Sequence, residues 1–289
     1  MESSAAAEAG SFKFVQHLAS ELSKGNLEVP GFPDVVLRIR RLLDDPGCDA
    51  NSIAKVVSGE PVLTAKLIRM VNSAALKPAS GEIRDPRTAI ARLGFTLVHS
   101  ATVSFAAEQM KQAQKYEAVK DKFDEVWHRS TDVAAVAYVV ARRCCRQLNP
   151  DEALLTGLIH SIGKLYILSR AQDYPELFEN EAQLVGVLSD WYVPTGESIL
   201  QSWEFPEEIV GAISSQLDSA RDPDEMPSLA DVLHVAVPLP SVLGRPDDMV
   251  PVLEATRAGE RLGMTTDQCL EVLAEAGEQI EELRGTLRD

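Results

Sequence analysis

The chain has 289 residues, 45% of them hydrophobic and 25% charged, which is the composition of a soluble globular protein with one large or two ordinary domains. Its formal net charge is −16, and residues 222–289 alone hold fifteen acidic and five basic residues, a net of −10. Such a field repels polyphosphates at long range, so we expect no nucleic-acid partner. No apolar run approaches the roughly 20 residues that cross a bilayer, and residues 1–10 do not form a secretion signal, so we expect no membrane span and a cytoplasmic location.

Four cysteines are spread along the chain, namely Cys48, Cys144, Cys145 and Cys269. They show no CxxC spacing and no accompanying cluster of histidines, which argues against a zinc knuckle and against a disulfide framework. We therefore expect reduced cysteines with no structural metal.

Residues 1–11 are rich in Ala, Ser and Glu, and we expect them to be disordered. From residue 12 onward, apolar residues recur at steps of three and four, and each run ends at Gly, Pro or Asn, the pattern of amphipathic helices. The helices predicted in the first half cover residues 12–22, 35–43, 50–57, 61–75, 88–94 and 96–110. Arg38, Arg40 and Arg41 on the second of these are interpreted as a solvated basic face.

Residues 111–122 are polar and are predicted to connect two halves. The helices predicted after this connection begin with a long one from residue 123 and continue at 154–168, 174–191, 195–206 (ending in a turn), 207–217, 229–237, 249–262 and 265–289. No stretch shows the alternation of a strand, so the fold class is all-α. The predicted units are an N-terminal helical subdomain at 12–110, a second helical subdomain at 123–240 and an acidic extension at 241–289.

The stretch from Leu154 to Leu168 is the apolar centre of the second half. His160 lies inside it, between Gly157 and Gly163. Glycine costs about 1 kcal/mol relative to alanine within a helix, so these two glycines predict close backbone approach or a break near Gly163.

The last predicted helix has an apolar stripe and a capping box at Thr265 and Gln268. The stripe alternates steps of three and four through Leu273, Ala276, Ile280, Leu283 and Leu287. It could form a homodimer through residues 265–289, or it could pack on its own domain.

Residues 29 to about 240 resemble the HDOD family of helical signalling modules, which is related to the HD-type metal phosphohydrolases. The motif positions that carry this resemblance are Pro61, Asn72, Ser73, Gly94 and Trp203, together with Trp127-His128-Arg129-Ser130 and Leu158-Ile159-His160-Ser161-Ile162-Gly163-Lys164. The resemblance implies a helical-bundle N-terminal half and an HD-like C-terminal half. For Asn72 we expect a capping or helix-bridging role.

The resemblance also implies where a metal site would lie. His128 and His160 match two histidines of the HD enzymes, but Ser161 stands in place of the adjoining aspartate. The remaining positions depart further, with Tyr192 at a downstream histidine, Gln216 and Leu217 at a histidine pair, and Val237 at the last aspartate. Lys164 would approach a phosphate in an active relative.

Two neutral imidazoles without a carboxylate bind a divalent ion poorly, because a serine hydroxyl stays protonated. We therefore predict no metal, no cofactor and no enzymatic activity, with His128 and His160 as core histidines hydrogen-bonded to each other or to hydroxyls such as those of Ser161 and Tyr192. Asp132 and Asp231 are the carboxylates that could complete a ligand set.

The favoured function is a non-catalytic bacterial signal-transduction module that binds a signalling protein, in a setting the family suggests, such as a cyclic-dinucleotide pathway. One alternative is a residual metal-dependent phosphodiesterase or phosphohydrolase acting on nucleotides or cyclic dinucleotides. Another is a nucleotide-sensing pocket at the former metal site.

Overall fold

The computed structural model describes residues 2–24, 27, 33–43, 45–73, 82–115, 117–145, 147–171, 173–174, 177, 180–218, 226–256 and 258–288. Within these ranges every regular element is helical, which confirms the all-α prediction. The first half contains α2 (Asp34–Leu43), α3 (Ala50–Val57), α4 (Pro61–Val71), α5 (Pro86–Leu93) and α6 (Phe95–Gln112). The second contains α7 (Glu117–Cys144), α8 (Pro150–Ile159), α9 (Ile162–Ala171), α11 (Glu181–Ser202), α12 (Glu207–Ser214) and α13 (Leu229–Ala236).

Local sequence signals set several of these boundaries. Pro61 begins α4, where its missing N–H has no helical partner to lose. The Asp85 side chain accepts a hydrogen bond from the main-chain N–H of Thr88 at 2.8 Å and so caps α5. Gly94 then joins α5 to α6 with φ at 78°, a left-handed conformation that favours glycine. This conformation explains why glycine occupies that motif position.

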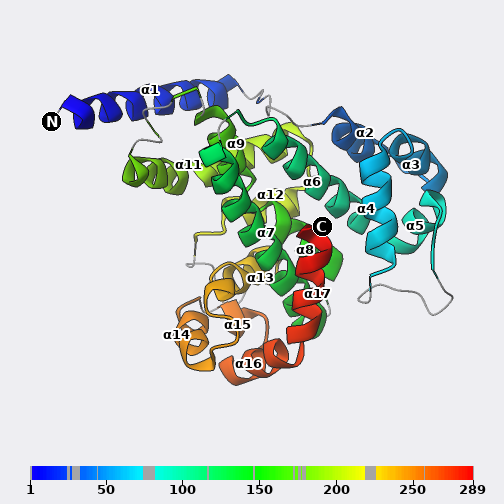
Figure 1. Cartoon of the computed structure of the whole chain (residues 1–289). Helices are drawn as coiled ribbons and strands as arrows, with labels where there is room; N and C mark the ends of the chain where they lie inside the picture. The colour runs from blue at the N-terminus through cyan, green and yellow to red at the C-terminus, as the bar shows by residue number, and fades with distance from the viewer. Residues whose placement is uncertain are drawn as a thin grey trace.

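Helix α7 is the central element of the molecule (Figure 1). It packs against α8, α9, α13 and the C-terminal helices, and its small apolar residues from Val133 to Ala141 are buried. A Cβ at Gly157 of α8 would lie 2.7 Å from the Cα of Ala134, so α8 can approach α7 closely only with glycine there. The predicted close approach at Gly157 is confirmed.

Helix α1 (Glu2–Lys24) packs on the second half of the chain, mainly on α11, and is hydrogen-bonded to α9. The Phe14 ring meets Tyr174 edge to face at 5.2 Å, and Glu21 accepts hydrogen bonds from Tyr166 and Arg170 at 2.8 and 2.7 Å. Residues 12–24 therefore do not belong with the predicted 12–110 subdomain. Helix α1 is drawn from Glu2, where the alanine-rich segment has good helix propensity, and the predicted disorder of residues 1–11 stays a prediction.

Two predicted boundaries in the second half are also wrong. Helix α7 begins at Glu117, so the connection between the halves is shorter than the predicted 111–122. Helix α11 runs from Glu181 through Pro194 to Ser202 without the predicted interruption. Burial of Tyr192, Ile199 and Leu200 offsets the roughly 3 kcal/mol that proline costs within a helix.

The acidic extension wraps the lower end of the second half and returns to the first (Figure 1). Its elements are the 3₁₀ turn η1 (Leu239–Ser241), α14 (Pro246–Thr256), α15 (Ala258–Arg261), α16 (Thr266–Glu275) and α17 (Gly277–Arg288). Helix α17 packs on α7 and also on α4 and α6.

The apolar stripe of the extension is buried within its own chain, at Leu273, Ala276, Ile280, Leu283 and Leu287. The predicted homodimer through residues 265–289 therefore has no exposed seam in this structure, and the alternative of packing on the same domain is the one observed.

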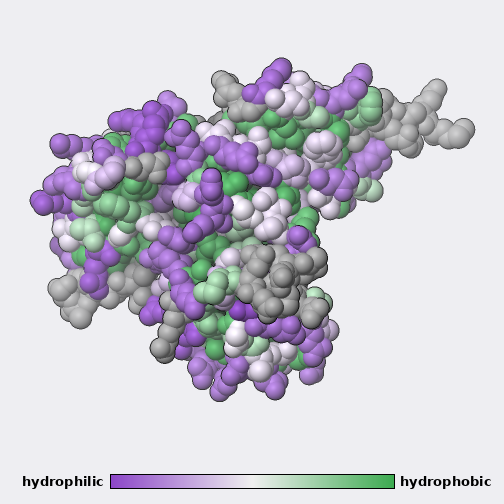
Figure 2. Space-filling view, turned by 180° about the vertical axis from the view of Figure 1, so that it is seen from behind, coloured by the Kyte–Doolittle hydropathy of each residue, from purple (hydrophilic) through white to green (hydrophobic). Residues whose placement is uncertain are grey.

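On the face that Figure 2 shows, hydrophilic side chains form much of the outline and hydrophobic ones lie mainly between them.

No single helix in the described part of the chain is long and apolar enough to cross a membrane. Helices α5 and α6 pass such a test only as a pair, and they are bent by 114° relative to each other.

Candidate functional site

His160 lies in the tight turn between α8 and α9, where only 3% of its surface is exposed. Its Nδ1 is 2.7 Å from the main-chain oxygen of Gly157, and a carbonyl only accepts, so Nδ1 carries the hydrogen. Its Nε2 is 2.8 Å from the Ser161 hydroxyl and accepts that hydrogen bond. The prediction of a core histidine bound to Ser161 is confirmed.

The imidazole of His160 is held neutral. Burial lowers its pKa from 6.5 to about 4, and the nearby positive charges of Lys164 and Arg129 act in the same direction. A metal would bind at the Nε2 lone pair, but the Ser161 hydroxyl already occupies this lone pair. Ser161 therefore removes the carboxylate of the HD pair and also blocks the neighbouring histidine.

Gln216 stands where the resemblance places one of two adjacent histidines, and it binds the turn that contains His160. Its side-chain amide donates to the main-chain oxygens of His160 at 3.1 Å and of Ile213 at 2.9 Å. Leu217, at the other position of the pair, is 65% exposed. The pair thus supplies one structural amide and no metal ligand.

Lys164 and Tyr192 face each other across α9 and α11. The ammonium lies 4.4 Å from the centroid of the Tyr192 ring, a cation–π contact. Gly163 makes this possible, because a Cβ there would lie 2.0 Å from the main-chain oxygen of Tyr192. Burial, followed by the charge of Arg129, lowers the pKa of Lys164. The predicted close approach at Gly163 is confirmed, while the helix break falls at His160 and Ser161.

Arg129 of α7 spans part of the same region. Its guanidinium donates to the main-chain oxygen of Val237 at 2.6 Å, next to α13. The resemblance places the last aspartate of the HD enzymes at Val237, so here a fixed cation reaches the place of a metal ligand. Burial lowers the pKa of Arg129.

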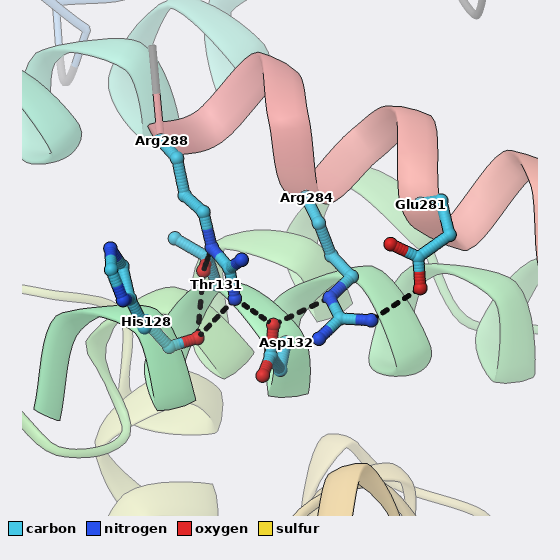
Figure 3. A network of polar contacts seen from close by, with 6 residues as sticks. All are labelled: His128, Thr131, Asp132, Glu281, Arg284 and Arg288. Atoms are coloured by element: carbon cyan, nitrogen blue, oxygen red, sulfur yellow. Dashed lines mark hydrogen bonds and ion pairs between the residues drawn. The ribbon is translucent and has the colours of Figure 1, made fainter. Parts of the chain in front are cut away.

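His128 is exposed, so the prediction that it is a core histidine paired with His160 is wrong. Its ring points away from the polar network on α7, and only its main-chain oxygen takes part (Figure 3). That oxygen accepts from the Thr131 hydroxyl at 2.8 Å and from Arg288 at 3.2 Å. The apolar pattern of α7 did not reveal this orientation, because His128 lies at the edge of the buried stripe.

Asp132 is bound by two arginines of the C-terminal helix. Arg284 Nε lies 2.6 Å from Asp132 Oδ1, and Arg288 pairs with the same oxygen (Figure 3). Arg288 also donates to the Thr131 hydroxyl at 3.0 Å. The carboxylate is therefore neutralised within the chain, and it is not free to join a metal site.

Asp231 is also paired, in this case inside the protein. It forms a buried ion pair with Arg261, and its other oxygen accepts from the main-chain and side-chain groups of Ser228 at 2.9 Å each. Arg261 further contacts His234 Nδ1 at 3.5 Å. Sequence reasoning missed Arg261, Arg284 and Arg288, although the spacing of four between the last two places them on one side of a helix.

The residues present do not suit a divalent cation. Among the described residues no three His, Cys, Asp or Glu side chains converge in a way that could hold a metal. His160 has its lone pair occupied, and Asp132 and Asp231 are bound by arginines. A tetrahedral or octahedral site needs several such donors at once.

The motif residues of the first half have structural contacts. The Asn72 side chain donates to the main-chain oxygens of Ile68 and Ile83 at 2.8 and 2.7 Å, and it accepts from the N–H of Ile83 at 2.9 Å. It thus ends α4 and fixes the chain where it returns before α5, a bridging role as expected. The Ser73 hydroxyl donates to the main-chain oxygen of Met70 at 2.8 Å.

A second cluster joins the two halves behind Trp203. The ring of Phe205 contacts the guanidinium of Arg40, 5.4 Å from its centroid, and stacks with the ring of His99 at 5.0 Å. Arg40 also donates to the main-chain oxygen of Glu204, whose φ is 57°. Arg40 is buried, so its interpretation as part of a solvated face is wrong, and Trp203 marks the segment that meets α2 and α6.

Two all-helical halves with these motif residues define a class of protein, the HD-related helical modules. Residues 29–219 match the model of the HDOD domain, and the chain belongs to this family.

The solved structures support the same fold. A Shewanella amazonensis SB2B protein, provisionally named a metal-dependent phosphohydrolase, is 24% identical with a TM-score of 0.73, and the match covers 96% of this chain and 99% of that one. An HDOD domain protein of unknown function from Geobacter sulfurreducens is 22% identical with a TM-score of 0.67, covering 94% and 97%. At these identities the likeness shows the fold alone.

A longer relative also matches in sequence. An uncharacterized protein from Treponema pallidum (strain Nichols) is 22% identical over 231 residues, which are 76% of this chain and 43% of that protein. This chain therefore spans less than half the length of that curated relative.

Proposed function

We propose that this chain is a non-catalytic signal-transduction module that acts by binding another protein. The observation that carries the proposal is the hydrogen bond from the Ser161 hydroxyl to His160 Nε2. A neutral hydroxyl stands where HD chemistry requires a carboxylate, and it donates to the remaining lone pair of the imidazole. Acidification of a bound water, the step that makes a hydroxide nucleophile near neutral pH, needs a metal held by anionic ligands.

The surrounding contacts support the same proposal. Asp132 and Asp231 are each bound by arginine, and Arg129 donates to the Val237 carbonyl. These contacts pair the charged groups of this region within the chain, and removing a partner leaves a buried or partly buried group unpaired. A scaffold that has become structural at its former active site is suited to presenting surfaces to a partner.

A second candidate function is the sensing of a phosphate-bearing small molecule, and one observation favours it. Lys164 and Arg129 lie close enough for each charge to affect neighbouring groups, and no carboxylate contributes to the lowered pKa of Lys164. Among the described residues neither side chain forms an ion pair, although the charge of Asp132 acts on Arg129, and such partly buried cations favour a phosphate ligand.

The decisive experiment measures metal content and turnover of the purified full chain. We expect no stoichiometric Mn, Fe or Zn, and no hydrolysis of nucleotides or cyclic dinucleotides above that of a His128→Ala, His160→Gln double variant. Stoichiometric metal together with turnover that this variant lacks would overturn the proposal.

Two further measurements separate partner binding from sensing. In-cell cross-linking followed by capture of the full chain should yield a specific protein. A nucleotide at a hundredfold its dissociation constant would stabilise the fold by about 2.7 kcal/mol, and Lys164→Gln should abolish that stabilisation if Lys164 binds the phosphate.

A further inference from the structure

Helix α17 rests on a surface formed by α4, α6 and α7, here called the α17 cradle. Ile280, Leu283 and Leu287 form its buried face, at spacings of three and four. The opposite face carries Glu278, Glu281 and Gly285 and is exposed. Helix α17 therefore contacts the rest of the chain as a peptide ligand would, along one amphipathic stripe.

The polar contacts of the α17 cradle recognise two arginines, as Figure 3 shows. Arg284 and Arg288 are one turn apart and point to the same oxygen of Asp132, between them on α7. Arg288 is fixed further by the Thr131 hydroxyl and the main-chain oxygen of His128. A single carboxylate flanked by two neutral acceptors thus matches guanidinium groups with a spacing of four residues.

The first half of the chain holds the end of the helix. Lys66 of α4 is buried, and its ammonium donates to the main-chain oxygen of Leu287 at 3.2 Å. A cation at the last turn of a helix satisfies a free carbonyl and interacts favourably with the helix dipole. Both halves therefore contribute to the α17 cradle.

We propose that the α17 cradle is a protein-docking site whose external ligand is an amphipathic helix with arginines four residues apart beside an apolar stripe. In the free chain α17 is the internal competitor for this site. This inference rests on the proposed partner-binding function and names the chemistry of the partner. The recognition mode is a helix in a groove.

Several features make α17 displaceable. The helix has only twelve residues and contains Gly277 and Gly285, so it is marginal once it leaves the cradle. The Arg284 and Arg288 side chains remain 20% and 31% exposed, and the Asp132 side chain is 15% exposed. Salt and competing cations reach such ion pairs and weaken them.

The test uses the full chain and a fluorescent peptide of residues 276–289, followed by fluorescence anisotropy. The Arg284→Gln, Arg288→Gln double variant weakens the internal competitor, so it should bind the peptide at least tenfold more tightly than the wild-type chain. Adding Asp132→Asn should abolish this gain. A peptide with glutamine at both arginines should fail to bind.

Arg245→Gln is the matched control, since Arg245 forms an exposed ion pair with Asp248 away from the cradle. It should leave peptide binding at the wild-type level. Circular dichroism must show that the double variant is folded. A folded double variant that does not bind the peptide, or that binds it equally well with Asp132→Asn, would overturn the proposal.

Hydrogen exchange on the wild-type chain is a test that needs no variant. The amides of α17 should exchange faster than those of α7, because α17 opens without global unfolding. Equal protection in both helices would contradict displacement. A wild-type dimer that Asp132→Asn dissociates would assign the cradle to a second copy and overturn the partner assignment. Capture of a partner elsewhere on the surface would refute this site and leave the proposed function standing.

Discussion

The Ser161 hydroxyl donates to His160 Nε2 at 2.8 Å, while Nδ1 of the same ring donates to the Gly157 carbonyl at 2.7 Å. These two hydrogen bonds fix one tautomer and leave no free lone pair on the ring. Ser161, which stands where the resemblance places an aspartate, thus satisfies the neighbouring histidine.

Replacing Ser161 with alanine should therefore destabilise the fold, because Nε2 becomes a buried acceptor without a donor. We expect a loss of about 1 to 3 kcal/mol in the free energy of unfolding. Urea denaturation of the variant measures it. Ser241→Ala is the control, since that exposed hydroxyl bonds only within its own turn, and it should change stability by less than about 0.5 kcal/mol. Equal effects of both substitutions would contradict the role of Ser161.

The stability of the protein should decrease in acid through His160. Its folded pKa of about 4 lies below the ordinary 6.5, so the unfolded chain takes up this proton first as the pH falls. The stabilisation is complete above pH 6.5 and declines by up to about 1.4 kcal/mol per pH unit toward pH 4. Denaturation curves at pH 7, 6 and 5 should show a smaller slope in His160→Gln than in the wild type. An equal dependence of stability on pH in His160→Gln and the wild type would show that another group causes the acid sensitivity.

Gly163 should not tolerate a side chain. The added Cβ of Gly163→Ala would overlap the main-chain oxygen of Tyr192, so α9 and α11 must separate. We expect destabilisation of about 1 to 3 kcal/mol, as for other overpacked cores. Gly186→Ala in α11 meets nothing within 4 Å and should be neutral or stabilising by up to about 1 kcal/mol. Thermal unfolding of the two variants gives the comparison.

Arg40 should be required for the contact between the two halves. Arg40→Gln removes a buried guanidinium from the Glu204 carbonyl and from the Phe205 ring. A loss of about 1.5 to 3 kcal/mol is expected for a hydrogen bond from a charged group. Exposed Arg41 on the same helix supplies the control, Arg41→Gln. The rate of amide hydrogen exchange around residues 203–206 should rise in Arg40→Gln and stay unchanged in Arg41→Gln.

Local patterns were sufficient where the deciding contacts lie within a few residues. The limits of α3, the proline start of α4 and the capping box of Thr265 and Gln268 all follow from short-range chemistry and are confirmed. The glycines of the central stretch correctly indicated close backbone approach, because only a missing side chain permits it.

The remaining features depend on residues far apart in the sequence. Asp132 and Arg284 are 152 positions apart, and no periodicity indicates that they meet. The burial of Arg40 is similar, since its acceptor is the carbonyl of Glu204 on the other half. The former metal site that the family resemblance implies stays a prediction, and no pattern in the sequence identified the arginines that pair with Asp132 and Asp231.

Each end of the chain contacts the other half, since α1 packs on the second half and α17, which lies mainly on α7, also contacts α4 and α6 of the first. A fragment cut between α6 and α7 would therefore leave each half without a helix that covers it. Separate expression of the halves should give aggregating products, whereas a split that leaves both terminal helices on their docking surfaces would preserve solubility. A fusion tag at either end must therefore leave α1 and α17 free to pack on these surfaces.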